Sequence, residues 1–269
     1  QLHYSQKNEN SLDMVLSVNG FPLVTIELKN QMTGQTVEDA KQQYKRDRDS
    51  KELIFQFNKR SLVHFAVDPD EVFMTTRLMG KHTFFLPFNK GYRKGAGNPP
   101  NPDGYKTDYL WKNIWQKDSL LDIIGRFMHI KEETKIKNNK EVTKKIMIFP
   151  RYHQLDAVRK IIGDVKEKGV GNNYLVQHST GSGKSITISW LAHHFSSLHN
   201  KNNEVIFDSI VVVTDLRVLD QQLQDTIYQF DHKMGVVKKI EEDSKQLAEA
   251  LKAGSKIIIT TLHKFAFIL

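Results

Sequence analysis

The first half of the chain alternates short apolar runs with turn-forming residues, a pattern that predicts β-strands joined by turns. Two apolar runs, residues 11–18 and 21–28, flank Asn19-Gly20, the dipeptide that most strongly predicts a tight hairpin turn. Further strands are expected over residues 53–57, 61–67 and 72–78. The N-terminal half is therefore predicted to contain a sheet that begins with a hairpin.

Helices are predicted on both sides of a long loop in this half. One is expected from about Thr36 to about Ser50, where Asp39 stands three residues after Thr36 as a capping partner. The Gly/Pro-rich segment 89–108 carries four cationic side chains, so it either contacts DNA or is a solvated loop. A helical pattern resumes at Tyr109, with an apolar stripe behind Ser119 as a cap. On it, Trp111 and Trp115 are interpreted as a packing pair rather than a base-stacking platform.

The highly polar segment 131–145 predicts a solvated linker and the boundary between two domains, residues 1–145 and 146–269. Beyond it, helices and apolar strands alternate, which predicts an α/β domain with a parallel sheet. The expected strands are residues 174–177, 210–214 and 256–261, and the expected helices are 152–165, 184–197, 218–229 and 244–252.

A phosphate-binding loop is predicted directly after the strand at 174–177. Gly181 and Gly183 let backbone N–H groups approach phosphate oxygens that side chains would obstruct. Lys184 supplies a cation, and Ser185 opens a helix where its hydroxyl can bind Mg²⁺. The spacing matches a Walker loop, although His178 stands where Gly or Ala is usual. The predicted ATP-binding residues here are Thr180, Gly181, Ser182, Gly183, Lys184 and Ser185.

Charge and composition narrow the class of protein. The 269 residues include 39 Lys and Arg against 31 Asp and Glu, so the net charge of +8 makes a polyanion a plausible partner. No cysteine is present, which excludes disulfides and thiolate metal sites and fits the cytoplasm. No apolar run approaches the roughly 18 residues needed to span a bilayer. Gln1 is not a natural start, so the chain is expected to be a fragment.

A second chemical signal lies in the N-terminal strands. A divalent-metal nuclease of the PD-(D/E)xK type needs a carboxylate on one strand and, on its neighbour, a carboxylate two residues before a lysine. The (D/E)xK string occurs seven times, but only Glu27 and Lys29 lie in an apolar strand, 14 residues after Asp13. The two-residue spacing puts Glu27 and Lys29 on one face. The local sequence alone also allows an ordinary exposed strand end.

Strand register decides whether these carboxylates can share a metal. A two-residue turn at Asn19-Gly20 sets Asp13 opposite Ile26 and points Glu27 to the other face. A three-residue loop or an equivalent bulge sets Asp13 opposite Glu27 instead. Pro22 cannot donate to a strand ladder, so an irregularity there is plausible. The nuclease hypothesis therefore requires a bulge or an odd loop.

Motifs along nearly the whole chain resemble the restriction (R) subunit of type I restriction enzymes. They include, in family order, SLDMVLSVNGFPLVTIELKN, FQFNKRSLVHFAVDPDEVFMTTRL, FFLPFNKG, GAGNPPNPDGYKTDYLW, PRYHQLDAV, HSTGSGKS, VVVTDLRVLDQQL and TTLHKF. The resemblance implies an α/β protein with a PD-(D/E)xK nuclease domain followed by part of a RecA-like superfamily 2 motor lobe. It also implies that the nuclease residues are Asp13, Glu27 and Lys29, with Mg²⁺ held by Asp13 and Glu27.

The resemblance assigns further positions in the second half. It implies that Gln154 reads the adenine of ATP, although Gln154 taken alone could be an ordinary exposed position on an apolar helix. The stretch 213–222 would be motif Ia and Thr260-Thr261 motif Ib, both along the DNA track. Two departures matter. Gln42, Gln43 and Tyr44 lack the Gln-x-x-x-Tyr spacing of related nucleases, and the chain stops before a water-activating motif and a second lobe, so it is expected to lack ATP turnover alone.

The expected function is ATP-dependent translocation on double-stranded DNA and Mg²⁺-dependent endonucleolytic cleavage far from the recognition site. By the resemblance, methyltransferase and specificity subunits recruit the protein. The lack of a long apolar run predicts that no membrane is involved. One alternative is an ATP-dependent helicase or translocase in which Asp13, Glu27 and Lys29 are structural. Another is a non-catalytic DNA-binding scaffold.

Overall fold

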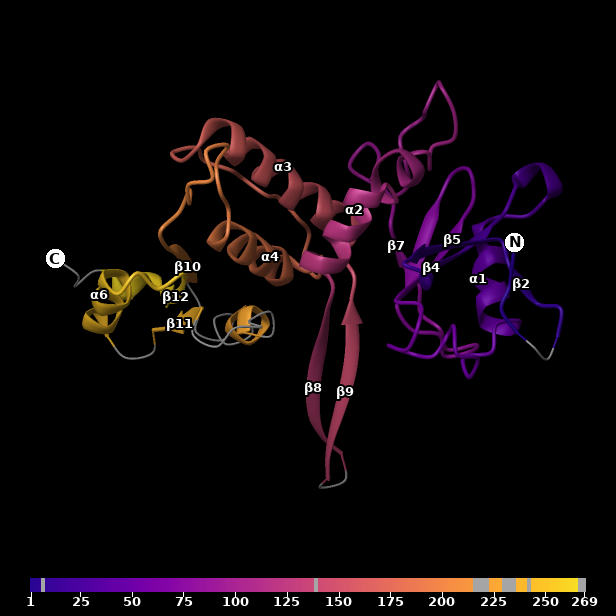
Figure 1. Ribbon diagram of the computed structural model, residues 1–269, viewed down its shortest axis with the longest axis horizontal. Coiled ribbons are helices and arrows are strands. Elements are labelled where there is room, and N and C mark those ends of the chain that lie inside the picture. Colours follow the sequence, from indigo (N-terminus) through magenta and orange to yellow (C-terminus); the bar gives the residue numbers. More distant parts are fainter. Residues whose placement is uncertain (6–7, 138–139, 215–222, 229–235, 241–242, 266–269) are drawn as a thin grey trace. The chain divides into compact units, whose positions relative to one another are not determined.

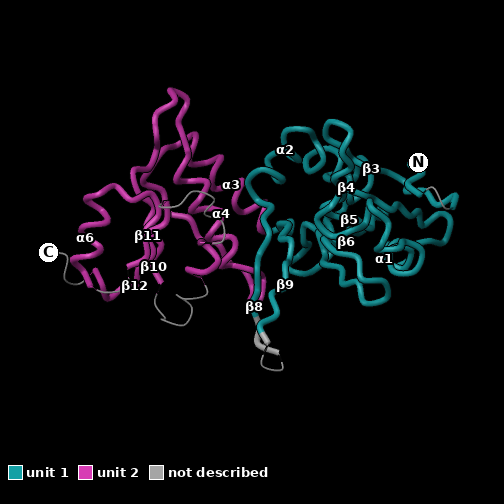
Figure 2. Tube along the Cα trace, turned by 60° about the horizontal axis from the view of Figure 1, so that its bottom comes forward, with its two compact units in different colours: residues 1–153 teal, residues 154–269 magenta. Residues whose placement is uncertain are grey.

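The chain forms two compact units, residues 1–153 and 154–269, whereas the sequence placed the boundary after residue 145 (Figure 2). The structure is a computed structural model that describes residues 1–5, 8–137, 140–214, 223–228, 236–240 and 243–265 (Figure 1). Both units combine helices and strands, in agreement with the predicted α/β class. Over the described ranges, no helix has the length and apolar character needed to cross a bilayer.

The first unit is built on a five-stranded sheet with the order β3-β4-β5-β6-β7. β4 and β5 are parallel and the other neighbours are antiparallel. The strands are β3 (Met14–Val18), β4 (Phe21–Leu28), β5 (Val63–Val67), β6 (Val72–Thr75) and β7 (Leu86–Pro87), and a separate pair is formed by β1 (Leu2–His3) and β2 (Ser11–Leu12). The parallel pair needs a crossover, and that crossover contains α1 (Val37–Arg46).

Helix α1 covers one face of this sheet. It begins as predicted, because the Thr36 N–H donates to the Asp39 carboxylate at 2.8 Å. Val37 and Ala40 pack in one cluster with Ala66 of β5. The expected strand at 53–57 is wrong, since these residues form turns. Their apolar side chains still serve the core, because Phe55 is buried beside Tyr44.

The β3–β4 hairpin contains the irregularity that the nuclease hypothesis requires. Its turn has two residues, and Asn19 (φ 50°) and Gly20 (φ 81°) both adopt the left-handed conformation that such a turn needs. Ser17 pairs with Pro22, but beyond a register shift Leu16 pairs with Val24. One extra residue in β4, next to Pro22, therefore forms a bulge that brings Asp13 into line with Glu27.

Residues 131–137 and 140–145 belong to the two strands of an antiparallel hairpin, so the predicted linker is wrong. β8 (His129–Lys137) pairs along its length with β9 (Lys140–Ile148), as Figure 1 shows. Side-chain pairs across the strands support the hairpin, such as Lys145 with Glu132 at 2.9 Å. The sequence did not predict these strands, because apolar and polar residues do not alternate along them as they do in a half-buried strand.

Helical segments lie between the sheet and the hairpin. They are single turns at Leu110–Ile114 and Ile123–Phe127 and the helix α2 (Lys117–Asp122). The predicted apolar stripe is buried at Leu120, Ile123 and Phe127. The helix begins after Gln116 rather than at Ser119.

The second unit contains a parallel three-stranded sheet with the order β10-β12-β11, which confirms the predicted parallel arrangement. Its elements are α3 (Tyr152–Lys168), α4 (Lys184–Ser196), β10 (Ile210–Thr214), β11 (Val237–Lys239), α6 (Ser244–Lys252) and β12 (Ile257–Thr261). The strand expected at 174–177 is wrong. No strand of the described residues pairs with this segment, and Leu175 is 92% exposed.

Candidate functional site

The structure brings together two of the predicted nuclease residues, Asp13 and Glu27. Asp13 lies between β2 and β3, and Glu27 lies near the end of β4. The backbone N–H of Leu28 donates to Asp13 Oδ2 at 2.8 Å, which fixes the Asp13 carboxylate beside β4. The two carboxyl groups are close enough that the Asp13 carboxyl contributes to the pKa of Glu27. The bulge thus has a chemical consequence, because it places two acids side by side.

Glu27 is completely buried. Its Oε1 accepts a hydrogen bond from Arg48 Nε at 2.7 Å, while its Oε2 has no hydrogen-bond donor among the described residues. Burial raises the pKa of Glu27 to about 7, the Arg48 guanidinium opposes that rise, and the Asp13 carboxyl adds to it. A buried carboxylate oxygen without a donor is unfavourable, and a bound cation would satisfy it.

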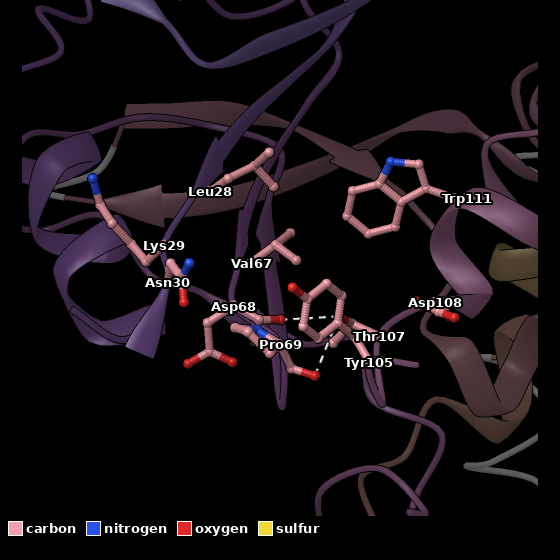
Figure 3. Close-up of a pocket in the computed structure, with 10 residues that line it drawn as sticks. All are labelled: Leu28, Lys29, Asn30, Val67, Asp68, Pro69, Tyr105, Thr107, Asp108 and Trp111. Atoms are coloured by element: carbon pink, nitrogen blue, oxygen red, sulfur yellow. Dashed lines mark hydrogen bonds between the residues drawn. The ribbon is translucent and has the colours of Figure 1, made fainter. Parts of the chain in front are cut away.

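Lys29 follows the last residue of β4, on the same face as Glu27. The backbone hydrogen bond from Thr36 is the main cause that lowers the pKa of Asp39 at the start of α1. The Lys29 ammonium group is close enough to lower that pKa further, by a smaller effect. Figure 3 shows the Lys29 side chain extending away from Trp111 and Tyr105. Lys29 therefore lies at the carboxyl end of the strand, beyond the two acids.

Arg48 is the residue of this site that the sequence did not reveal. Only 5% of it is exposed, and its Nη2 donates to the Ser11 carbonyl oxygen at 2.8 Å. Its guanidinium also lies over the Tyr4 ring, 5.6 Å from the ring centroid. Arg48 follows a charged stretch that looks solvated in the sequence, so only its position in the fold shows that it neutralises Glu27.

A buried polar chain lies next to Glu27 on the same face of the sheet. Tyr44 Oη and Thr25 Oγ1 are 2.9 Å apart, and Thr25 Oγ1 is 2.7 Å from His64 Nδ1. This contact gives Tyr44, whose role the sequence left open, a structural position in the core. Burial lowers the pKa of His64 to about 3, so the imidazole is neutral.

We expect His64 to make the first unit sensitive to acid. The unfolded chain binds a proton near pH 6.5 that the folded chain does not bind until about pH 3, so the stability that His64 contributes is present above pH 6.5 and falls below it. The loss is about 1.4 kcal/mol per pH unit. Glu27 has the opposite effect on the pH dependence of stability. The stability that Glu27 contributes is present below pH 4.5 and is lost as the pH rises to about 7. Comparing His64→Asn with the parent cancels the Glu27 contribution.

The measurement is urea unfolding at pH 6.5 and 4.5, followed by the fluorescence of Trp111 and Trp115 in a Trp190→Phe background. When the pH falls from 6.5 to 4.5, the free energy of unfolding of His64→Asn should decrease by about 2–3 kcal/mol less than that of the parent. Equal losses in both proteins would show that folding does not lower the pKa of His64.

We expect Arg48→Met to destabilise the first unit, because it leaves the Glu27 carboxylate buried without its counter-ion. Removing one partner of a buried ion pair costs about 3–5 kcal/mol. Arg46→Met is the matched control, since Arg46 lies on the same stretch and is exposed. The double variant Glu27→Gln/Arg48→Met should recover much of the loss in urea unfolding. A double variant no more stable than Arg48→Met would contradict the ion-pair explanation.

The phosphate loop has the backbone conformation that the sequence predicts. Gly181 and Gly183 have φ values of +76° and +85°, and Gly183 directly precedes α4. The positive φ favours glycine at position 183, and a Cβ there would lie 2.5 Å from Gln154 Nε2, so the Gln154 side chain would have to shift. Lys184 Nζ is exposed and donates to the carbonyl oxygens of Ser179 at 2.9 Å and His178 at 3.2 Å. The loop therefore presents an available cation at a helix N-terminus.

Gln154 contacts this loop directly. Only 4% of it is exposed, and its Nε2 donates to the carbonyl oxygens of Ser182 at 3.2 Å and Gly183 at 3.1 Å. The alternative of an ordinary exposed position is therefore wrong. The side chain links the start of α3 to the turn that would hold phosphate.

The other predicted motifs have different outcomes. Thr260 and Thr261 end β12 and are buried, so in this structure their side chains do not face solvent. Of the motif Ia stretch, residues 215–222 lie outside the described residues.

In the part of the chain that is described, no group of three or more His, Asp or Glu residues could hold a metal ion. Asp13 and Glu27 would supply only two protein ligands.

Comparisons with known proteins match both units. Residues 1–83 match the family of the type I restriction enzyme R protein N terminus, and residues 153–267 match the SWI2/SNF2 ATPase family. A protein named as the endonuclease subunit of type I restriction enzyme MjaVIIIP from Methanocaldococcus jannaschii is 26% identical over 96% of this chain and 25% of its own. The SauCOLORF180P subunit of Staphylococcus aureus (strain COL) is 26% identical over 94% of this chain and 24% of its own. The HindI subunit of Haemophilus influenzae is 27% identical over 94% and 23%.

The chain spans about a quarter of the length of these curated relatives. No solved structure matches it. The predicted resemblance to the R subunit of type I restriction enzymes is confirmed, and it extends over nearly the whole chain.

Proposed function

We propose that the first unit is a PD-(D/E)xK-type nuclease domain that cuts double-stranded DNA with Mg²⁺. The observation that carries this proposal is the buried Glu27 carboxyl, which lies close to the Asp13 carboxyl and whose Oε2 has no donor within the described ranges. A purely structural glutamate would be expected to use both oxygens. The similarity to endonuclease subunits supports the same reading.

Asp13 and Glu27 would hold the metal, and its remaining ligands would be water and phosphate oxygens of DNA. Bound there, Mg²⁺ would supply Lewis-acid activation of the scissile phosphate and of a water nucleophile. Asp13 is kept in place by the Leu28 N–H, and the negative charge of Glu27 is stabilised by Arg48. Lys29, on the same face as Glu27, would orient the attacking water and offset charge that develops on the phosphate.

We propose that the second unit binds ATP as part of a RecA-like superfamily 2 motor. Residues 180–185 would surround the phosphates, with Lys184 as the cation and Ser185 as a Mg²⁺ ligand. Gln154, already bonded to the loop, would read the adenine. The match of residues 153–267 to SWI2/SNF2 ATPases supports nucleotide use.

The whole protein would use ATP to translocate on DNA and cut far from the recognition site. Methyltransferase and specificity subunits would choose that site, as the similarity to type I restriction enzyme subunits suggests. The Arg48–Glu27 ion pair favours a second candidate, because an internal cation already neutralises the acid. In that case the protein would be a helicase or translocase, with Asp13, Glu27 and Lys29 in structural roles.

Substituting Asp13 tests these alternatives. Asp13→Asn keeps an oxygen for the Leu28 N–H but removes a charge from the metal site, and Asp70→Asn is the control, at a partly exposed aspartate that pairs with Lys106. Both variants would be assembled with methyltransferase and specificity subunits, and plasmid cleavage would be measured with Mg²⁺ and ATP. The nuclease predicts that only Asp13→Asn loses cleavage. Parental cleavage by Asp13→Asn would favour the translocase.

A further inference from the structure

A pocket of about 440 Å³ opens at the carboxyl ends of the parallel strands β4 and β5, and of the three candidate nuclease residues only Lys29 lines it (Figure 3). Leu28 and Val67 give it an apolar side, and Tyr105 and Trp111 add two aromatic rings. Leu28 precedes Lys29 directly, so the pocket and the lysine share one end of one strand. The volume falls in the range of small-molecule sites, about 300–1,000 Å³.

The two aromatic side chains of the pocket expose much of their surface. Trp111 is 40% exposed and Tyr105 is 62% exposed. Trp111 packs edge-on against Trp115 with 4.9 Å between ring centroids, and Trp115 packs against Phe65 of the core at 5.4 Å. The Tyr105 carbonyl oxygen accepts a hydrogen bond from Asn101 Nδ2 at 2.9 Å. Trp115 therefore has the packing role predicted for the pair, while Trp111 keeps surface for a ligand.

The charges around the pocket favour a neutral, flat ligand in its interior. The Asp68 carboxylate accepts from the backbone N–H groups of Val37 and Glu71, so it has an internal role. Asp108 pairs with Lys112 at 2.9 Å. Lys29 is the single cationic side chain among the ten described residues that line the pocket, and its side chain extends away from the rings. An anionic phosphate is thus disfavoured inside and favoured at Lys29.

We propose that this pocket binds one nucleobase of a DNA strand, stacked on Trp111 and Tyr105, while the adjoining backbone phosphate lies toward Lys29. This inference rests on the proposed nuclease function and adds a base-binding position to it. Aromatic side chains stack on any base, because every base presents a π face. The pocket would therefore take an unpaired nucleotide without sequence preference. The strand would be held with its backbone at the carboxyl end of β4.

The test is binding of a fluorescein-labelled single-stranded oligonucleotide to the chain, followed by fluorescence polarisation without divalent metal. Tyr105→Ala and Trp111→Ala should each weaken binding about tenfold or more. Trp111→Phe should stay near the parent, which separates stacking from a loss of folding. Phe84→Ala is the matched control, because Phe84 is an aromatic residue with 74% exposure that does not line the pocket.

A second oligonucleotide, in which abasic sites keep the sugar and phosphate but lack the base, separates binding of the base from binding of the backbone. It should bind the parent about as weakly as the intact oligonucleotide binds Trp111→Ala. Equal binding of both oligonucleotides to the parent, or parental affinity in Tyr105→Ala and Trp111→Ala, would overturn the proposal. If the chain binds DNA in a base-dependent way but the assembled enzyme cleaves no plasmid DNA, the proposed nuclease function is refuted and the proposed base pocket is still supported.

Discussion

Glu27→Ala is expected to abolish DNA cleavage in the assembled enzyme and leave DNA-stimulated ATP hydrolysis largely intact. The substitution removes one of two acids that would hold the metal, and it lies in a different compact unit from the phosphate loop. Loss of a residue that merely supports a metal ligand costs about 10–100-fold, so loss of a ligand should cost at least about 100-fold. The measurement is plasmid cleavage and ATP hydrolysis on the same DNA.

Controls separate chemistry from folding at this position. Glu27→Gln keeps an acceptor for Arg48 but carries no charge for a metal, so it should also fail to cut while the unit stays folded. Glu38→Ala removes a largely exposed acid of α1 and should cut normally. Cleavage by Glu27→Ala at the parental rate would remove Glu27 from the mechanism. A parallel loss of ATP hydrolysis would mean that the substitution damages the whole protein.

The acids of this site could be predicted from the sequence because their signals are local. Glu27 and Lys29 alternate within an apolar strand, and Asn19-Gly20 predicts the turn before them. The register could only be stated as a condition, because a bulge depends on how a single residue beside Pro22 fits the ladder. Arg48 could not be found, since its burial against Glu27 exists only once α1 packs on the sheet.

The missed elements have equally physical causes. Residues 53–57 have a strand-like composition, but Ile54 and Phe55 reach the core from turns and need no ladder. Residues 174–177 also have that composition, yet a strand needs a partner for its backbone groups. The hairpin of β8 and β9 shows the reverse case. Its backbone pairing and cross-strand side chains stabilise a polar segment that lacks apolar alternation.

In the second unit, the sequence predicted the glycine-rich loop at residues 180–185 more accurately than the strands of the sheet. Glycines with positive φ are required by the turn itself, so Gly181 and Gly183 can be recognised in isolation. The contact of Gln154 with Ser182 and Gly183 joins residues far apart in the chain, so it required the structure.

Lys184→Ala is expected to remove nucleotide binding from this chain. Lys184 Nζ now donates to two loop carbonyl oxygens, and a triphosphate would replace these neutral partners with charged ones. A fluorescent ATP analogue titrated with Mg²⁺ should bind at least about tenfold more weakly to Lys184→Ala, while Lys166→Ala, on an exposed position of α3, should bind like the parent. Unchanged binding by Lys184→Ala would remove the loop from the nucleotide site.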